Sequence, residues 1–514
     1  MEHKKRRIVA SLQADDQGGS VISLLTLLYL GLPLLIFFAG WLKPAFALVT
    51  IIPLLYCGWH LLRAWPVAGP AFRGGELLFL AAFGFGLTAF VGIGGWAPQQ
   101  TDWIKHNAVL FDCVNQPWPV VLTDGSARWP LVYYLAYYLP AALVGKLAGY
   151  AAAQAALWVW SALGLMLAGG WFARLTRLPV WVAAPAFFCF SGLVVVANLL
   201  VQILGLSIHS SRLAWYPNES WAWMWQFPSH YWMLEWAPGQ ALAGWLAAGM
   251  YLAGPRTLRP LCFGVLCTCA LLWSPFVALG LGLLAFFLAW RDGPPWPVKP
   301  GAPLLALLPP LGVLGAFYAT KRSAELAARF PPIDIAWFTR FHEAPRPLKS
   351  VILLGLFIGF GFGLLLCLIR RRFTKDSAER RLADACGLTL LCLLPVTVGY
   401  FSDLSMRASA VPLFGLALLT ARALACPGLT PGLRRALWLV VLIGGLTPLI
   451  EAAHQADHLV TRRYDARVAP QQDSAVVHMA DGGFNNFGAQ YVGAPNTFFF
   501  RTLARGGTKN KLGK

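Results

Sequence analysis

The chain has 514 residues, of which 58% are hydrophobic and 12% are charged, and its formal net charge is +19. Soluble domains carry about 25% charged residues, so this composition excludes an ordinary water-soluble protein with one core. In a soluble protein the excess of Lys and Arg would suggest a nucleic-acid partner. Here the basic residues fall largely at the ends of apolar runs, as in the cytoplasmic loops of membrane proteins. We therefore expect the membrane, and no nucleic acid, as the partner.

The apolar residues form runs, and a run of roughly 18 to 23 residues crosses a hydrocarbon layer of about 30 Å as a helix. The runs predict an all-α polytopic membrane protein with about thirteen transmembrane helices. They lie at residues 21–41, 43–63, 76–96, 131–149, 150–172, 179–205, 237–254, 260–290, 303–320, 350–370, 385–402, 408–425 and 434–452.

Basic residues predict the orientation, because cytoplasmic loops are enriched in Lys and Arg. HKKRR places the N-terminus in the cytoplasm, and the third run then carries QQTDW to the outer face. The run 131–149 contains four Tyr, a residue that favours the headgroup region, so we expect a helix lying along the outer surface. WSPF at residues 273–276 should divide its run into a hairpin of two helices.

Three regions follow from this threading. Residues 1–75 form an N-terminal cytoplasmic segment and a helical hairpin, 76–452 a transmembrane domain, and 453–514 a small outer C-terminal tail that docks as a loop-rich segment. The outer loops are predicted at 97–149, 206–236 and 321–349, and they concentrate the charged and aromatic residues. We expect a multi-pass protein of the inner or plasma membrane whose chemistry occurs on the outer face.

The first outer loop begins with QQTDWIKHNAVLFD, in which Thr101 can cap a helix that has Asp102 in its first turn. The helix dipole favours the ionised form of Asp102 there. At about 100° per residue, Asp102, Lys105 and His106 share one face, with Asp112 near its edge. This predicts an amphipathic surface helix that presents a carboxylate to a substrate or a metal ion. An ordinary solvated face would have the same spacing.

The second outer loop contains six Trp residues together with charged and imidazole groups. Aromatic rings stack on sugars and also anchor loops at the interface. Arg is suited to holding a phosphate. Candidate binding residues in this loop are His209, Arg212, His230 and Glu235. The alternative is an aromatic belt with solvated charges.

The third outer loop has an excess of positive charge that includes Lys321 and Arg322. A polyanionic ligand such as a lipid phosphate would explain this excess, and so would attraction to anionic headgroups. Further along the chain, Asp403 and Arg407 stand four residues apart before an apolar run. This spacing permits a local ion pair, and it equally allows Arg407 to reach a phosphate.

The arrangement from about Glu76 to Ala452 resembles the GT-C superfamily of membrane glycosyltransferases, which includes the aminoarabinose transferases and protein O-mannosyltransferases. Asp102 matches the acidic residue early in the first outer loop. WPLVYYL, with one Pro where the family has a pair, and KLAG match the motif that follows. MRASAVPLFG resembles the family's late basic segment, with Arg407 at the basic position.

The resemblance implies a polyprenyl-phosphate sugar as donor and a lipid or glycan as acceptor. It implies that Asp102 accepts the proton of the acceptor hydroxyl, or is the ligand of a divalent metal, Mg²⁺ or Mn²⁺, if the reaction uses one. Arg212, Lys321, Arg322 and Arg407 are the residues expected to hold the phosphate. One alternative is a polysaccharide polymerase or ligase of the O-antigen type, which acts on lipid pyrophosphates through His209, Arg212, His230 and Arg407. A lipid or glycan transporter is another.

Overall fold

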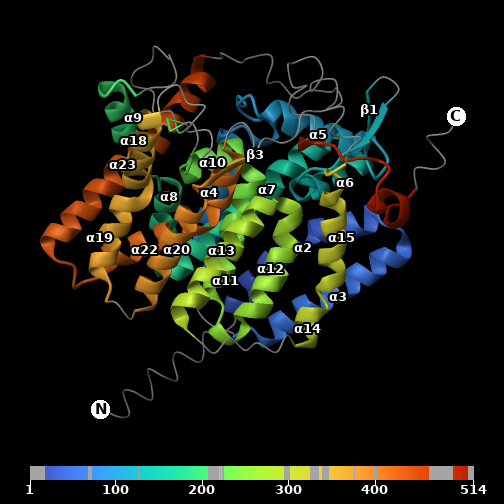
Figure 1. Cartoon of the computed structure of the whole chain (residues 1–514), viewed down its shortest axis with the longest axis horizontal. Helices are drawn as coiled ribbons and strands as arrows, with labels where there is room; N and C mark the ends of the chain where they lie inside the picture. Colours follow the sequence, from blue (N-terminus) through green and yellow to red (C-terminus); the bar gives the residue numbers. More distant parts are fainter. Residues whose placement is uncertain are drawn as a thin grey trace, which may run out of the picture.

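The computed structural model is mainly helical, and its helices run side by side as a bundle (Figure 1). The structure describes residues 18–66, 72–124, 127–206, 219, 221–222, 225–293, 301–323, 335–337, 347–374, 377–398, 402–461 and 490–506. The α-helices are α2 (Gly18–Trp41), α3 (Pro44–Ala64), α4 (Gly74–Phe90), α5 (Trp103–Asn115), α6 (Leu139–Ala148), α7 (Tyr150–Thr176), α8 (Val180–Phe188), α9 (Val194–Ile203), α10 (His230–Trp236), α11 (Pro238–Ala253), α12 (Arg259–Trp273), α13 (Pro275–Asp292), α14 (Ala302–Leu305), α15 (Leu308–Ala319), α18 (Pro347–Ile358), α19 (Leu364–Arg372), α20 (Ala378–Cys392), α21 (Asp403–Ala408), α22 (Ala410–Ala425) and α23 (Pro431–Thr461).

The remaining elements are short. Two antiparallel strand pairs join β1 (Val121–Asp124) to β2 (Ala127–Pro130) and β3 (Ile335–Trp337) to β4 (Val396–Val398). Tight or wide helical turns complete the described chain: η1 (Ile93–Gly95), η2 (Leu135–Tyr137), η3 (Arg256–Leu258), η4 (Gly359–Gly363) and η8 (Phe499–Leu503).

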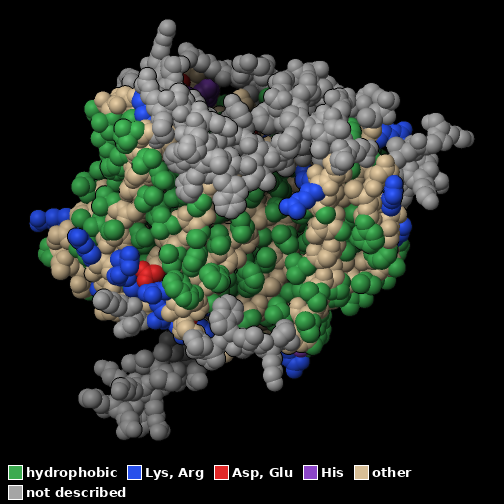
Figure 2. All heavy atoms as spheres, in the orientation of Figure 1, with side chains coloured by type: hydrophobic (Ala, Val, Ile, Leu, Met, Phe, Trp, Pro, Cys, Tyr) green, Lys and Arg blue, Asp and Glu red, His purple; other side chains and the backbone are tan. Residues whose placement is uncertain are grey.

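Eight of the described helices are long and apolar enough to cross a membrane, and four shorter apolar helices have 10–17 residues. The chain is therefore a multi-pass α-helical membrane protein, whereas thirteen crossings are not established by these lengths. Figure 2 agrees with this assignment, since hydrophobic side chains cover the middle of the visible face and Lys and Arg lie toward its margins. The long helices are Val21–Trp41, Pro44–Ala64, Tyr150–Thr176, Arg256–Trp273, Pro275–Asp292, Ala302–Ala319, Leu348–Arg372 and Pro431–Thr461.

One end of the bundle, which we call the basic end, collects the arginine residues of three loops around two carboxylates. Asp292 pairs with Arg256 at 3.0 Å, and Arg259 and Arg381 also reach it, at 2.7 and 2.6 Å. Asp384 pairs in the same way with arginines at 2.6, 2.9 and 3.5 Å. The loops that the charge pattern assigns to one side thus meet at one end. The opposite end, at the top of Figure 1, carries α5, α10 and β1, and we call it the α5 end.

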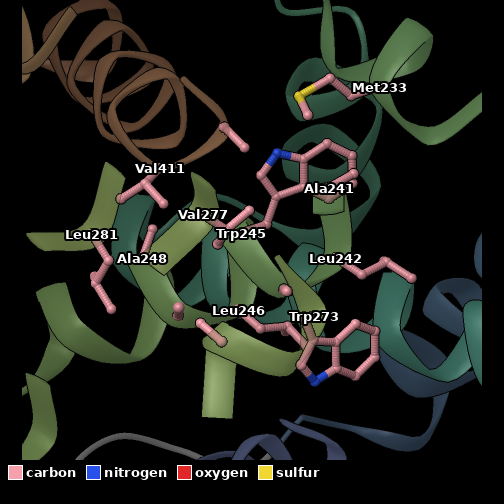
Figure 3. Packing of buried hydrophobic residues seen from close by; sticks show 14 of the residues in the cluster. Met233, Ala241, Leu242, Trp245, Leu246, Ala248, Trp273, Val277, Leu281 and Val411 are labelled. Carbon is pink, nitrogen blue, oxygen red and sulfur yellow. The ribbon is translucent and has the colours of Figure 1, made fainter. Parts of the chain in front are cut away.

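The core is centred on α11, which is buried along almost its whole length. Figure 3 shows Trp245 of α11 surrounded by apolar side chains of neighbouring helices, among them Val277 and Val411. Small residues let helices approach closely in a membrane protein. A Cβ on Gly280 of α13 would lie 2.2 Å from the carbonyl oxygen of Ala408, so this glycine is required for the contact between α13 and α21.

The run 179–205, expected to be one crossing, is interrupted, and α8 ends before α9 begins. The backbone N–H of Leu193 in the gap donates to the carbonyl of Phe360, 2.9 Å away in the π-helical turn η4. A Cβ on Gly192 would lie 2.7 Å from the carbonyl oxygen of Gly361. Unpaired backbone groups are costly away from water, so this interruption is stabilised by the π-helical turn η4, which lies within the continuous helix Leu348–Arg372.

Two other segments also depart from the helices expected for them. In the run 131–149 only α6 is an α-helix, and Tyr133, Tyr137 and Tyr138 are buried in the protein instead of facing the headgroup region. α5 is buried along most of its length, so it is not a solvated surface helix. The division at WSPF is confirmed, because α12 ends at Trp273 and α13 begins at Pro275.

The C-terminal segment, residues 490–506, docks against the α5 end. Its backbone pairs with segments from three distant parts of the chain, and it bridges the loop between α2 and α3, the residues after β2, and the end of α15. The backbone bonds are Val132 N–H to Tyr491 O (2.8 Å), Gly493 N–H to Pro130 O (2.9 Å), Ala494 N–H to Thr320 O (3.1 Å), Lys43 N–H to Leu503 O (2.9 Å) and Arg505 N–H to Trp41 O (2.8 Å).

Candidate functional site

Asp102 and Lys105 form an ion pair on the first turn of α5. Helix α5 begins one residue later than predicted, with Asp102 and not Thr101 at the position before the helix. The Lys105 ammonium lies 2.5 Å from the carboxylate, and 41% of the Asp102 side chain is exposed. Partial burial opposes ionisation, but the charge and hydrogen bond of Lys105 outweigh it and lower the pKa of Asp102. Asp102 is therefore an ionised carboxylate with access to a ligand.

Asp403 and Arg407 form a second ion pair, on the short helix α21. The guanidinium Nη2 lies 2.8 Å from the Asp403 carboxylate, and the two side chains are only 7% and 12% exposed. Burial alone would lower the pKa of Arg407, but Asp403 and the neighbouring tyrosines raise it, so the guanidinium is charged. In the described part of the chain, its buried Nε–H has no hydrogen-bond partner. Arg407 thus keeps an unused donor in a position shielded from water.

Tyrosine residues that follow β2 connect the two ion pairs. The ring of Tyr134 lies 5.3 Å from the Arg407 guanidinium and stacks on Tyr133 with ring centroids 4.6 Å apart. The charge of Arg407 acts on both Asp102 and Lys105, and Lys105 also interacts electrostatically with the Tyr133 hydroxyl group. We call Asp102, Lys105, Tyr133, Tyr134, Asp403 and Arg407 the Asp102–Arg407 cluster. It joins the three sequence segments that carried the family resemblance.

His106 and Asp112 lie on α5 but point into the protein. His106 shares a hydrogen bond of 2.5 Å with the Tyr138 hydroxyl, and its other ring nitrogen lies 3.3 Å from the carbonyl of Trp236. Burial, reinforced by the Lys105 charge, lowers the pKa of His106 to about 3, so the ring is neutral. Asp112 is buried and accepts a hydrogen bond of 2.8 Å from Gln116. His106 thus stabilises α5 against its neighbours, and the bond to Asp112 stabilises the C-terminal end of α5.

Glu235 and His230 belong to α10, beside the start of α5. Gln100 donates to one carboxylate oxygen of Glu235 at 3.1 Å, and the other oxygen, also buried, has no partner among the described residues. Burial raises the pKa of Glu235 to about 8. His230 is enclosed by aromatic rings, and its ring centroid lies 4.2 Å from that of Phe187. Burial lowers the pKa of His230 to about 3. His230 is thus a neutral interior residue.

Lys321 and Arg322, the predicted cations of the third loop, lie in different environments. Lys321 donates a hydrogen bond of 2.7 Å to the carbonyl of Gln490, and this bond joins the end of α15 to the C-terminal segment. Burial lowers the pKa of Lys321 to about 7. Arg322 is exposed. His209 and Arg212 lie outside the described residues.

The donor groups at Asp102 do not fit a divalent metal. Its carboxylate already pairs with the Lys105 ammonium, and the Arg407 charge acts on it as well. Divalent cations prefer several oxygen ligands. Across the described ranges, no group of three His, Cys, Asp or Glu side chains could hold a metal ion. We therefore derive no step through a metal.

Sequence reasoning did not identify Tyr491, which the C-terminal segment places beside Tyr133 with ring centroids 4.7 Å apart. Nothing in GAQYVGAP marks this tyrosine, because its partners lie more than 300 residues away along the chain. Comparison with known proteins gives no relative to guide the assignment: no family model, no curated protein and no solved structure matches the chain.

Proposed function

We propose that the chain is a membrane glycosyltransferase of the GT-C type, which moves a sugar from a polyprenyl-phosphate donor to a lipid or glycan acceptor. One observation carries the proposal: an ionised, accessible carboxylate and a buried guanidinium with an unused donor lie in one cluster built from distant segments. On this proposal the α5 end faces the outside of the inner or plasma membrane.

The cluster offers the two functions that the reaction needs. As the acceptor hydroxyl attacks the anomeric carbon, its proton passes to Asp102. The bond from the anomeric carbon to the phosphate oxygen breaks, and its electron pair leaves with the lipid phosphate. Arg407 and Lys105 stabilise the negative charge on that phosphate. Because Asp102 is ionised near neutral pH, it is ready to accept the proton.

The test uses the full chain in lipid nanodiscs and a panel of radiolabelled polyprenyl-phosphate sugars, with release of the polyprenyl phosphate as the readout. Asp102→Asn should lower turnover by about 100-fold or more, because general-base catalysis contributes roughly that factor. Asp457→Asn, which changes an exposed carboxylate on α23, is the matched control and should retain turnover. The melting temperatures of both variants report whether they fold.

The polymerase or ligase alternative predicts a different pattern. It retains a need for Arg407, which would bind a lipid pyrophosphate, but it does not need Asp102. Full turnover by Asp102→Asn together with loss of turnover in Arg407→Gln would favour that alternative. A separate assay uses the chain in proteoliposomes. Movement of labelled lipid across their membrane, with no covalent product, would instead favour a transporter.

A further inference from the structure

The C-terminal segment is fixed at the α5 end by its backbone, independently of any ligand. Gly493 pairs with Pro130 at the end of β2, Tyr491 pairs with Val132 just after it, and Ala494 pairs with Thr320 at the end of α15. The contact is tight, since a Cβ on Gly493 would lie 2.3 Å from the Thr320 hydroxyl and 2.6 Å from a methyl group of Val132. The register of the segment, and hence the position of Tyr491, is therefore well determined.

The side chain of Tyr491 extends a row of three aromatic rings. Tyr134 stacks on Tyr133 at 4.6 Å, and Tyr133 lies against Tyr491 at 4.7 Å with 34° between the ring planes. Electrostatic interactions of the Tyr491 hydroxyl reach Asp102, Arg407 and Asp403. The row thus places this hydroxyl at the Asp102–Arg407 cluster, although the residue comes from the opposite end of the chain.

One donor at this place, the buried Nε–H of Arg407, has no hydrogen-bond partner in the described part of the chain. Burial raises the pKa of Tyr491 well above its usual value, so the hydroxyl keeps its proton and acts as a donor. The stacked rings of Tyr133 and Tyr134 link this phenol to the Arg407 guanidinium. Two such donors in one cluster suit an anion with several acceptor oxygens, such as a phosphate ester.

We infer that Tyr491 is a donor-binding residue, and that its hydroxyl and the Arg407 guanidinium together hold the phosphate of the lipid-linked sugar. The C-terminal segment is then part of the site and not only a surface strap. This inference rests on the proposed function, because the phosphate it invokes is that of the donor.

The experiment measures binding of a polyprenyl monophosphate to the full chain in nanodiscs, with the matching polyprenol as the uncharged control and inorganic phosphate as competitor. Tyr491→Phe keeps the stacked ring and removes the hydroxyl. A hydrogen bond to a charged group is lost, so the Kd for the phosphate lipid should rise by about tenfold to 100-fold, and the Kd for the polyprenol should not change. Arg501→Gln changes an exposed residue of the same segment and should leave both values unchanged.

A second variant tests the segment as a whole. Gly493→Ala should displace the segment because its Cβ meets Thr320 and Val132. It should then weaken phosphate-lipid binding at least as much as Tyr491→Phe and expose the segment to protease. Gly315→Ala on α15, where a Cβ meets nothing within 4 Å, is the matched control.

The outcomes separate the inference from the proposed function. Unchanged affinity in Tyr491→Phe, with binding lost in Arg407→Gln, would overturn the inference and leave the proposed function standing. Absence of phosphate-lipid binding in the wild type would overturn both. Equal affinity for inorganic phosphate and for its lipid ester would support Tyr491 as an anion ligand and contradict a lipid-linked donor.

Discussion

The two ends of the bundle use arginine in opposite ways. At the basic end each carboxylate is shared by three guanidinium groups, some of them well exposed, such as Arg256 at 58%. At the α5 end Arg407 is buried with one carboxylate, Asp403, and retains an unpaired Nε–H. An exposed arginine such as Arg256 contributes little to stability, since two other arginines also pair with its partner Asp292. Breaking the single buried pair of Asp403 and Arg407 costs much more. The difference is that several arginines share each carboxylate at the basic end, whereas Arg407 at the α5 end has one carboxylate and an unused donor, as the proposed function requires.

The largest predicted effect is on the free energy of unfolding, and it tests this difference between the two ends directly. Asp403→Asn should lower the free energy of unfolding by about 3–5 kcal/mol, because it leaves the buried guanidinium of Arg407 without its counter-charge. Arg256→Gln at the basic end should cost only about 0–1 kcal/mol. Denaturation in detergent, followed by circular dichroism, measures both values. Similar losses in the two variants would contradict the contrast.

A second change tests how Arg407 is positioned. Gly280→Ala should lower the free energy of unfolding by about 1–3 kcal/mol, because its Cβ collides with the backbone at Ala408 and moves α21. Donor turnover should fall with it. Gly282→Ala, whose Cβ has one contact at 3.9 Å, serves as the control and should change neither quantity. If both variants behave alike, close packing of α13 does not position the site.

The smallest predicted effect concerns the buried carboxyl group of Glu235, on α10 at the α5 end. Because the pKa of Glu235 is raised to about 8, the native state holds its proton at a pH where the unfolded chain has released it. This contribution to stability should be complete at low pH and be lost as the pH rises to about 8. Glu235→Gln should flatten that part of the pH–stability curve, measured as melting temperature. An unchanged slope would mean that Glu235 does not remain protonated in the fold.

The sequence allowed much of the bundle to be predicted, because apolar runs, proline and basic loop residues act locally. The break after Trp273 follows from such signals. The interruption at Gly192 could not be predicted, since its stabilising partner, the turn at Phe360, lies far away along the chain.

The candidate site was predicted in part for the same reason. Helical spacing placed Asp102 and Lys105 on one face, and it allowed the pair of Asp403 with Arg407 as one of two alternatives. The orientation of α5 does not, because helical periodicity alone cannot tell a solvated polar face from one buried against other polar groups. The burial of His106 beside Tyr138 shows this, as does the position of Tyr491, which depends on tertiary contacts.

The contact between the interruption at Gly192 and the π-helical turn η4 has an evolutionary consequence. A substitution that straightened either helix would withdraw one partner of the bond between Leu193 and Phe360 and leave the other helix with a polar gap in an apolar setting. Natural variants should therefore keep both the gap at Gly192 and the π-helical turn η4, or lose both. Residue changes at these two segments should be correlated among homologous sequences.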